Sequence, residues 1–310
     1  MKASIVIVTY NHANFIDKAL KSVLDQKADF PFEVIISEDA STDGTRDIVR
    51  GWQERYPQTI RLLLSEKNVR SNRVIARGFE AAKGDYVALL DGDDFWTSPD
   101  KLARQVAVLD ADPSLSLCFT NAQVVDAAGK PTAQLWTPAT TPARLTLPDL
   151  WLGNPFPTCG SLFRRSCVPT IPAWYDGFFP VTDWPLYILF AEHGDIAFLN
   201  EPMGAYRLHP GGLYSSQADD QKLAAMDGLY CKLEQCLDPR HLDGLRNGHR
   251  RYFLDWAREH LRLGNSSLAR MSLERARGSG AGWSSGDGIE VAVLSARMLL
   301  RSAMRPGVRH

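Results

Sequence analysis

The first part of the chain alternates between apolar runs and segments of helical periodicity. Residues 3–9 are rich in β-branched side chains without polar interruption, which predicts a strand that is buried on both faces of a parallel sheet. Further strands are predicted over residues 32–37, 59–65 and 85–90. Apolar residues three or four positions apart predict helices over residues 15–26, 41–56, 72–84 and 99–112. This alternation predicts βαβ units on a mostly parallel sheet with flanking helices.

The rest of the chain shows two further patterns. Up to about residue 215 the sequence predicts both strands and helices. Strands are predicted over 115–126 and 159–165, and loop and short helix over the proline-rich 138–157. A helix is predicted over 182–194, and strand, turn and strand over 196–209. From about Asp219 the pattern is helical only, and residues 252–277 predict two helices around Gly264 and Asn265. We therefore predict an α/β domain over residues 1–215, an α-helical extension over 216–277, and a flexible linker with a basic amphipathic helix over 278–310.

Composition narrows the class of protein. The 310 residues are 45% hydrophobic and 23% charged, as in soluble globular proteins. A net charge of -1 gives no bulk attraction to nucleic acid, so we expect no nucleic-acid partner. The five cysteines lack zinc-site spacing and are expected to be idle thiols in a reducing compartment. Because neither a signal peptide nor an apolar run of about 18 residues is found, the protein is predicted to be cytoplasmic.

Polar side chains follow three of the predicted strands. They are the segments Thr9–Asn11, Glu38–Asp39 and Asp91–Asp94. In an open α/β sheet, ligands bind beyond the carboxyl ends of the strands. We therefore expect these three segments, which are far apart in the sequence, to share one edge of the sheet.

The sequence ALLDGDDFW, residues 88–96, places three carboxylates directly before Phe95 and Trp96. Like charges this close repel and raise one another's pKa, so the arrangement favours a bound cation. Mg²⁺ and Mn²⁺ take oxygen ligands and are often bound by one or two carboxylates plus substrate phosphates. The alternatives are a solvated acidic turn and a phosphotransfer nucleophile with its acid partner, which would more naturally follow the first strand.

Three blocks of sequence together resemble glycosyltransferase family 2. They are IVIVTYNH, ISEDASTDGT and GDYVALLDGDDFW followed by SPDKL, and the resemblance covers about residues 3–215. It implies the Rossmann-like GT-A fold, with a nucleotide-sugar half over 1–112 and an acceptor half over 113–215. It also implies a metal-dependent, inverting enzyme whose donor is a nucleotide sugar, most often a UDP-sugar, and whose cofactor is Mn²⁺ or Mg²⁺.

The resemblance also implies roles for individual residues at the donor. Thr9 and Tyr10 would line the base pocket, Asp39 would hydrogen-bond the uracil, and Asp91 would face the ribose or sugar. Asp93 and Asp94 would hold the metal. Further donor contacts are expected from Asn11, Glu38, Arg70 and Arg207. The segment NVRSNR lacks the glycine that is common in the family after Asn68-Val69, so the sequence departs from the pattern at Arg70.

The acceptor hydroxyl requires a general base. By resemblance this is Asp183, with Trp184 offering an aromatic face to a sugar ring. The alternative for Asp183 is a plain helix cap, and Glu192 is a weaker candidate base. By resemblance His209 is a candidate metal ligand, and Arg207 would pair with phosphate oxygens, whereas a lone histidine is otherwise structural.

We predict that the protein moves a sugar from a nucleotide diphosphate sugar to an acceptor hydroxyl in a surface polysaccharide, lipid-linked glycan or protein glycan. The alternatives are a non-catalytic nucleotide-sugar-binding protein and a nucleotidyltransferase, although YNHAN is not the glycine-rich loop that the latter would need. Arg297, Arg301 and Arg305 lie four apart. Their helix would either lie on an anionic membrane at its inner face or dock on the preceding helices. The helical region is also a candidate homodimer surface.

Overall fold

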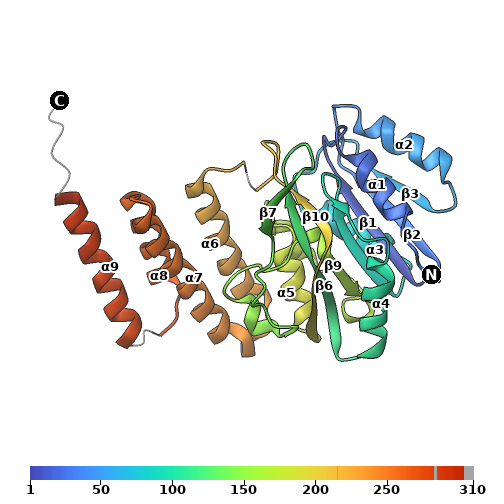
Figure 1. Ribbon diagram of the computed structural model, residues 1–310. Helices are drawn as coiled ribbons and strands as arrows, with labels where there is room; N and C mark the ends of the chain where they lie inside the picture. Colours follow the sequence, from blue (N-terminus) through green and yellow to red (C-terminus); the bar gives the residue numbers. More distant parts are fainter. Residues whose placement is uncertain (215, 283–284, 304–310) are drawn as a thin grey trace. The chain divides into compact units, whose positions relative to one another are not determined.

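The computed structural model describes residues 1–214, 216–282 and 285–303 (Figure 1). The chain divides into two compact units. The α/β unit comprises Met1–Leu147 and Asn154–Ser216, and the helical unit comprises Pro148–Gly153 and the described residues from Gln217 onwards. Arg305 lies outside the described residues.

A 10-stranded sheet forms the centre of the α/β unit, and most of it follows the order β3-β2-β1-β4-β9-β6-β10-β5. The strands are β1 (Ala3–Thr9), β2 (Phe32–Glu38), β3 (Ile60–Leu64), β4 (Tyr86–Asp91), β5 (Phe95–Trp96), β6 (Leu115–Val125), β7 (Pro131–Leu135), β8 (Arg144–Leu145), β9 (Ser161–Arg164) and β10 (Asp195–Arg207). The first four strands in this order are parallel, whereas β9 pairs antiparallel with both β4 and β6. The predicted α/β fold is therefore confirmed.

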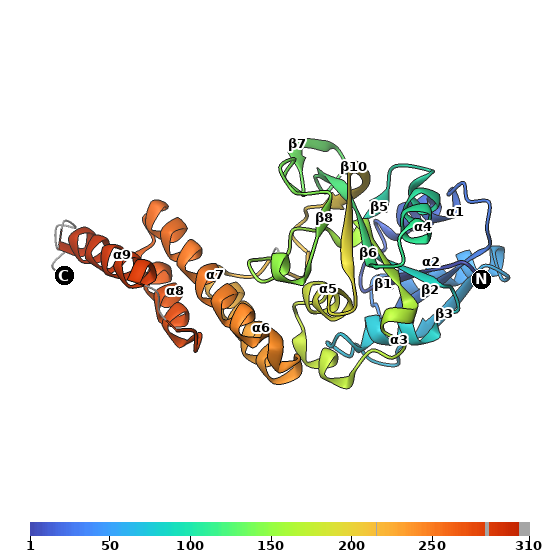
Figure 2. The same ribbon diagram turned by 90° about the horizontal axis from the view of Figure 1, so that it is seen from below.

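Helices cover both faces of the sheet. In the α/β unit they are α1 (Ile16–Leu24), α2 (Thr45–Arg55), α3 (Arg73–Ala81), α4 (Lys101–Ala111) and α5 (Trp184–Ala191). Ile5 and Ile7 of β1 belong to the core cluster that contains α1 and α4, whereas Val6 contacts Gly78 of α3. Because side chains alternate along a strand, α1 and α4 lie on one face and α3 on the other (Figure 2).

The acceptor half differs from the sequence prediction in two places. Residues 196–209 do not form strand, turn and strand, so that prediction is wrong. Asp195–Arg207 instead form one long strand, β10, whose register with β6 shifts on both sides of Pro202, and His209 lies beyond its end. Such bulges accommodate a proline that cannot donate a ladder hydrogen bond. The exposed strand β7 was not predicted, because its sequence PTAQL is short and begins with a proline.

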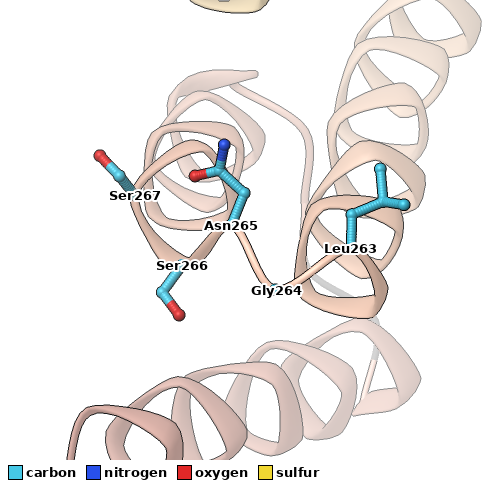
Figure 3. Close-up of a pocket in the computed structure, with 5 residues that line it drawn as sticks. All are labelled: Leu263, Gly264, Asn265, Ser266 and Ser267. Atoms are coloured by element: carbon cyan, nitrogen blue, oxygen red, sulfur yellow. The ribbon is translucent and has the colours of Figure 1, made fainter. Parts of the chain in front are cut away.

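The helical unit contains α6 (Asp219–Cys236), α7 (Leu242–Arg262), α8 (Ser266–Gly278) and α9 (Ser285–Ala303). The predicted pair of helices around Gly264 and Asn265 is confirmed. Gly264 has a φ of 82°, and the side chain of Asn265 accepts a hydrogen bond from Leu268 N at 3.1 Å. A hollow of about 340 Å³ at this turn is lined by uncharged residues (Figure 3). Its one side-chain amide already caps α8, so the hollow offers no evident chemistry.

Short 3-10 helices complete the chain. They are η1 (Leu147–Leu150), η2 (Thr158–Gly160), η3 (Arg165–Cys167), η4 (Ala173–Phe178) and η5 (Pro239–His241). Within the described part of the chain, no helix has the length and apolar character needed to cross a membrane.

Candidate active site

The carboxyl ends of β1, β2 and β4 meet at one edge of the sheet. Thr9 pairs with Glu38 across β1 and β2, and Val8 pairs with Asp91 across β1 and β4. The three polar segments that follow these strands are therefore neighbours, as expected for parallel strands.

Glu38 and Asp39 hold the loops at this edge of the sheet. Glu38 is fully buried. Its carboxylate accepts hydrogen bonds from Arg46 Nε at 2.6 Å and from Ser41 N at 2.5 Å. Asp39 is 6% exposed, and its Oδ1 accepts from Ser65 Oγ at 2.9 Å and from Val69 N at 3.1 Å. Both carboxylates are thus occupied by protein groups, and their predicted donor contacts stay predictions.

The loop after β1 adopts an uncommon backbone conformation. Asn11 has a φ of 56°, and its Oδ1 accepts a hydrogen bond from Thr42 N at 2.8 Å. Tyr10 is 41% exposed, so its ring is accessible to a ligand. Thr9 is buried. Arg70, in the loop before α3, is exposed and has a φ of 45°.

Asp93 and His209 come together although they are far apart in the sequence. His209 Nε2 lies 2.9 Å from Asp93 Oδ2, and His12 Nε2 lies 3.7 Å from the same oxygen. Burial would raise the pKa of Asp93, but the hydrogen bond with His209 and the nearby His12 together hold it below its ordinary value. Burial lowers the pKa of His12, which favours the neutral imidazole that binds metals.

Asp94 is turned away from this pair. It is 2% exposed, and its Oδ1 accepts a hydrogen bond from Arg207 N at 2.8 Å. Its Oδ2 is buried without a hydrogen-bond partner among the described residues. Burial, followed by the charges of Asp93 and Asp91, raises the pKa of Asp94 well above its ordinary value. Burial, Asp93 and Asp183 likewise raise the pKa of Asp91 to about 8.

Arg207 holds the acidic segment in place. Its Nε donates to Asp93 O at 2.7 Å, and its Nη1 donates to Ala127 O at 2.9 Å. Its guanidinium also lies 4.7 Å from the centre of the Phe15 ring. The arginine is 6% exposed, so in this structure it braces the segment that carries the acids.

Gly92 allows the turn that aims Asp93 outward. A Cβ at this position would lie 2.7 Å from Thr9 Oγ1 and 2.8 Å from His12 Nδ1. Both distances are shorter than carbon–oxygen and carbon–nitrogen contacts allow, so a side chain here would displace the two residues beside Asp93.

Asp183 is the N-cap residue directly before α5. Its Oδ1 accepts a hydrogen bond from Trp184 N at 2.8 Å, and its Oδ2 accepts one from Asn154 Nδ2 at 2.6 Å. Burial raises its pKa, and its charge in turn raises the pKa of Asp91. The helix-cap role is therefore confirmed, and Asp183 also lies near the acids at the end of β4.

Two other residues of this helix occupy different surroundings. Trp184 is 3% exposed, so the expectation that its ring faces a sugar is wrong. Every residue of α5 is buried, and the Trp184 side chain packs into the interior with the rest of the helix. Glu192 follows the last residue of α5, at the opposite end of the helix from Asp183, which is a poor position for a base serving the same site.

The residues at the end of β4 fit a divalent cation that is shared with a substrate. Among the described residues, no group of three acidic, histidine or cysteine side chains converges as a complete metal site. Asp93 and His209 instead offer one oxygen and one nitrogen ligand side by side. Such a partial set is typical of metals whose remaining ligands are water and phosphate. The proximity of His12 to Asp93 becomes visible only in the fold, because the two residues are far apart in the sequence.

The chain belongs to glycosyl transferase family 2, because the sequence profile of that family matches residues 4–168. An uncharacterized protein of Mycobacterium tuberculosis is 35% identical over 251 residues, which cover 80% of this chain and 69% of the relative. Two solved structures share the fold. TarS of Staphylococcus aureus (residues 1–349), in complex with UDP-GlcNAc, has a TM-score of 0.58 at 18% identity, covering 92% of this chain and 93% of that chain. The mannosyltransferase PcManGT of Pyrobaculum calidifontis, in complex with GDP-Man and Mn²⁺, has a TM-score of 0.55 at 17% identity, covering 97% and 86%.

Proposed function

We propose that the protein is a metal-dependent, inverting glycosyltransferase that moves a sugar from a nucleotide diphosphate sugar, preferably a UDP-sugar, to an acceptor hydroxyl. The observation that carries this proposal is the placement of Asp183 near the acids at the end of β4, in a chain of glycosyl transferase family 2. Asp93 and His209 would then bind the donor through a metal ion, and the Asp183 carboxylate would accept the proton of the acceptor hydroxyl. The similarity to structures in complex with UDP-GlcNAc and with GDP-Man and Mn²⁺ supports a nucleotide-sugar donor.

The donor would occupy the edge formed by β1, β2 and β4. Tyr10 is exposed there and offers a ring to the base. Asp39 would exchange one of its present partners for the base, while its bond to Val69 N keeps the following loop in place. Arg70 lies in that loop, exposed to solvent, where a cation would attract the diphosphate.

Asp93 and His209 would hold Mn²⁺ or Mg²⁺, with His12 close by. A bound divalent cation supplies Lewis-acid stabilisation of the charge that develops on the leaving diphosphate. Asp94 and Arg207 support this arrangement from inside, because their hydrogen bond ties the end of β10 to the acidic segment.

Asp183 would act as the general base. Asn154 and the amide of Trp184 orient its carboxylate, and its raised pKa makes it a better proton acceptor than an ordinary carboxylate. It takes the proton of the acceptor hydroxyl while the acceptor oxygen bonds to the anomeric carbon. The bond from that carbon to the diphosphate oxygen breaks, and the nucleoside diphosphate leaves. A single displacement of this kind inverts the anomeric configuration.

The acceptor proposed is a surface polysaccharide, lipid-linked glycan or protein glycan.

The charges and exposed apolar side chains of α9 support a proposed contact with the inner face of a membrane. The acids Asp287 and Glu290 of α9 pair with Arg250 at 3.2 Å and with Arg258 at 2.5 Å. Ile289 is 66% exposed and Val293 is 44% exposed. Residues 291–310 include Arg297, Arg301, Arg305 and Arg309 and no acid, a composition that suits an anionic lipid surface. A homodimer stays a prediction.

A donor screen tests the proposed function. The protein is incubated with Mn²⁺ and a panel of nucleotide sugars, and the release of nucleoside diphosphate is followed alongside that of an Asp93→Asn variant. We expect slow hydrolysis of one donor by the wild type and a large loss in the variant. Release of sugar 1-phosphate in place of nucleoside diphosphate would indicate a nucleotidyltransferase, because transfer of the nucleotidyl group breaks the bond between the two phosphates. Binding of a donor without turnover, with or without glycan acceptors, would indicate a non-catalytic binding protein.

A further inference from the structure

An aromatic pair lies on the acceptor half of the α/β unit, where Trp184 is unavailable. The rings of Trp136 and Tyr206 have centroids 4.2 Å apart and planes inclined by 49°. Both side chains are partly exposed, so each ring keeps some surface free. Neither residue stood out in the sequence, because Trp136 follows the irregular strand β7 and Tyr206 lies within β10.

The strand geometry turns Tyr206 away from the arginine that braces the acids. Side chains alternate along β10, and Arg207 packs against Phe15 and Asp93 on one face. Tyr206 therefore points to the other face, as does Gly204 two positions earlier. A Cβ on Gly204 would lie 3.0 Å from the sulfur of Cys159, so this face is the one that η2 covers.

Hydrogen bonds connect the pair to the proposed base: Thr137, next to Trp136, donates through its Oγ1 to Pro155 O at 2.7 Å, and Asn154, next to Pro155, donates to Asp183 Oδ2 at 2.6 Å. In agreement, burial, and then the charges of Asp94, Asp91, Asp183 and Asp93, raise the pKa of the Tyr206 phenol. Its hydroxyl forms no hydrogen bond with the described residues. Trp136 is fixed beside it, because its amide donates to Ala122 O of β6 at 2.9 Å. The pair thus presents two apolar faces and one free hydroxyl next to the proposed base.

This combination suits a sugar ring. A pyranose has an apolar C–H face, which packs on an aromatic ring, and hydroxyls around its rim, which exchange hydrogen bonds with a phenol. Tyrosine and tryptophan provide such contact area with few rotatable bonds, so little conformational entropy is lost on binding. Tyr10 is also an exposed aromatic residue, but it follows β1 at the proposed donor edge and is separate from the pair Trp136–Tyr206.

We propose that Trp136 and Tyr206 form the acceptor subsite and bind a pyranose ring whose attacking hydroxyl faces Asp183. This inference rests on the proposed function, since it assigns the acceptor of the same reaction. Without an acceptor in the subsite, water takes its place at the base. Donor hydrolysis therefore reports on donor binding and the base, whereas sugar transfer also reports on the acceptor subsite.

The test compares hydrolysis with transfer in the same variants. Acceptors are the methyl α- and β-glycosides of glucose, galactose, mannose and N-acetylglucosamine, and the donor is the one that the wild type hydrolyses. We expect Trp136→Ala and Tyr206→Ala each to raise KM for the methyl glycoside by about tenfold, as for truncation of an aromatic contact. Their hydrolysis of donor in the absence of glycoside should fall less than their transfer, so the ratio of transfer to hydrolysis should drop in both variants.

Conservative variants separate binding from folding. Both rings also pack against the core, so Trp136→Phe and Tyr206→Phe are measured in parallel, and they should give smaller increases in KM. Tyr56→Ala is the matched control, because Tyr56 stacks on Trp52 at 5.7 Å after the end of α2, away from the acids, and it should leave KM unchanged.

Three outcomes would overturn the inference. The first is that the wild type hydrolyses the donor but transfers the sugar to none of the methyl pyranosides. The second is an acceptor KM that is unchanged in both alanine variants. The third is a loss of hydrolysis and transfer in equal proportion in all four variants, because a purely structural role predicts this. If the wild type hydrolyses no donor, the proposed function itself fails.

Discussion

The donor side and the acceptor side of the α/β unit are built in different ways. On the donor side, parallel strands end in register, so short segments after β1, β2 and β4 become neighbours. On the acceptor side, Asp183 directly precedes α5, Trp136 directly follows β7, and Tyr206 lies in the irregular strand β10. A ligand site at the ends of strands in repeated βαβ units can be predicted from the sequence. A site assembled from loops and irregular segments that share no repeated pattern becomes visible only in the fold.

The largest effect is expected where the acceptor side supplies the base. Asp183→Asn should lower kcat for transfer by about 10³-fold, because an amide cannot take the acceptor proton. Asparagine is also a good helix cap, so α5 should remain folded. Glu192→Gln at the other end of the same helix is the control and should be near wild type. Turnover of Asp183→Asn close to that of wild type would show that the base lies elsewhere.

A smaller effect is expected where the donor side holds the cation. His209→Ala should raise the Mn²⁺ concentration needed for half-maximal donor hydrolysis by about 10- to 100-fold, because one ligand beside Asp93 is lost. The exposed His193 supplies the control, and His193→Ala should not change the Mn²⁺ requirement. An identical Mn²⁺ titration for His209→Ala and wild type would exclude His209 as a ligand.

Lys101, the first residue of α4, gives a prediction for stability. It is fully buried, its Nζ is 2.6 Å from Gln105 Oε1, and burial lowers its pKa to about 7. The unfolded lysine titrates near its ordinary value of 10.5. Between these values the unfolded chain binds more protons, so this group makes the free energy of unfolding rise with pH.

Denaturant unfolding of wild type and Lys101→Met measures this contribution. The wild-type free energy of unfolding minus that of the variant should grow by about 2 kcal/mol from pH 7 to pH 9. Taking the difference removes the opposing effect of the buried cysteines, whose pKa values burial raises. The exposed Lys83 gives the control Lys83→Met, for which the difference should be flat. A flat difference for Lys101→Met as well would mean that Lys101 stays charged in the fold.

The smallest effect is expected in the helical unit, which lies outside the comparison of the two sides. Replacing Ile289 and Val293 by serine should reduce co-sedimentation with phosphatidylglycerol vesicles several-fold, since two exposed apolar contacts are lost. Leu263→Ser removes another exposed leucine, at 62% exposure, and should have little effect. Equal co-sedimentation of all three proteins, or equal binding to phosphatidylcholine vesicles, would rule out the membrane contact.

The same comparison explains how much the sequence could predict. The acidic segment, its glycine and the strands before it were predicted because each is contiguous and has a characteristic pattern. Asp183 was assigned by resemblance, and the structure then placed it near Asp91. The inward turn of Asp94 was not predictable, since it depends on Arg207 N in the distant strand β10. His12 near Asp93 and the pair Trp136–Tyr206 likewise depend on tertiary packing.

Donor binding and proton abstraction are assigned to Asp93 and Asp183 respectively, and calorimetry tests this separation most directly. The nucleotide sugar is titrated in the presence of Mn²⁺ into wild type, Asp93→Asn and Asp183→Asn. We predict that Asp183→Asn binds the donor with wild-type affinity although it fails to transfer the sugar, and that Asp93→Asn binds at least about tenfold more weakly. Wild-type affinity in Asp93→Asn, together with weakened binding in Asp183→Asn, would contradict the assignment.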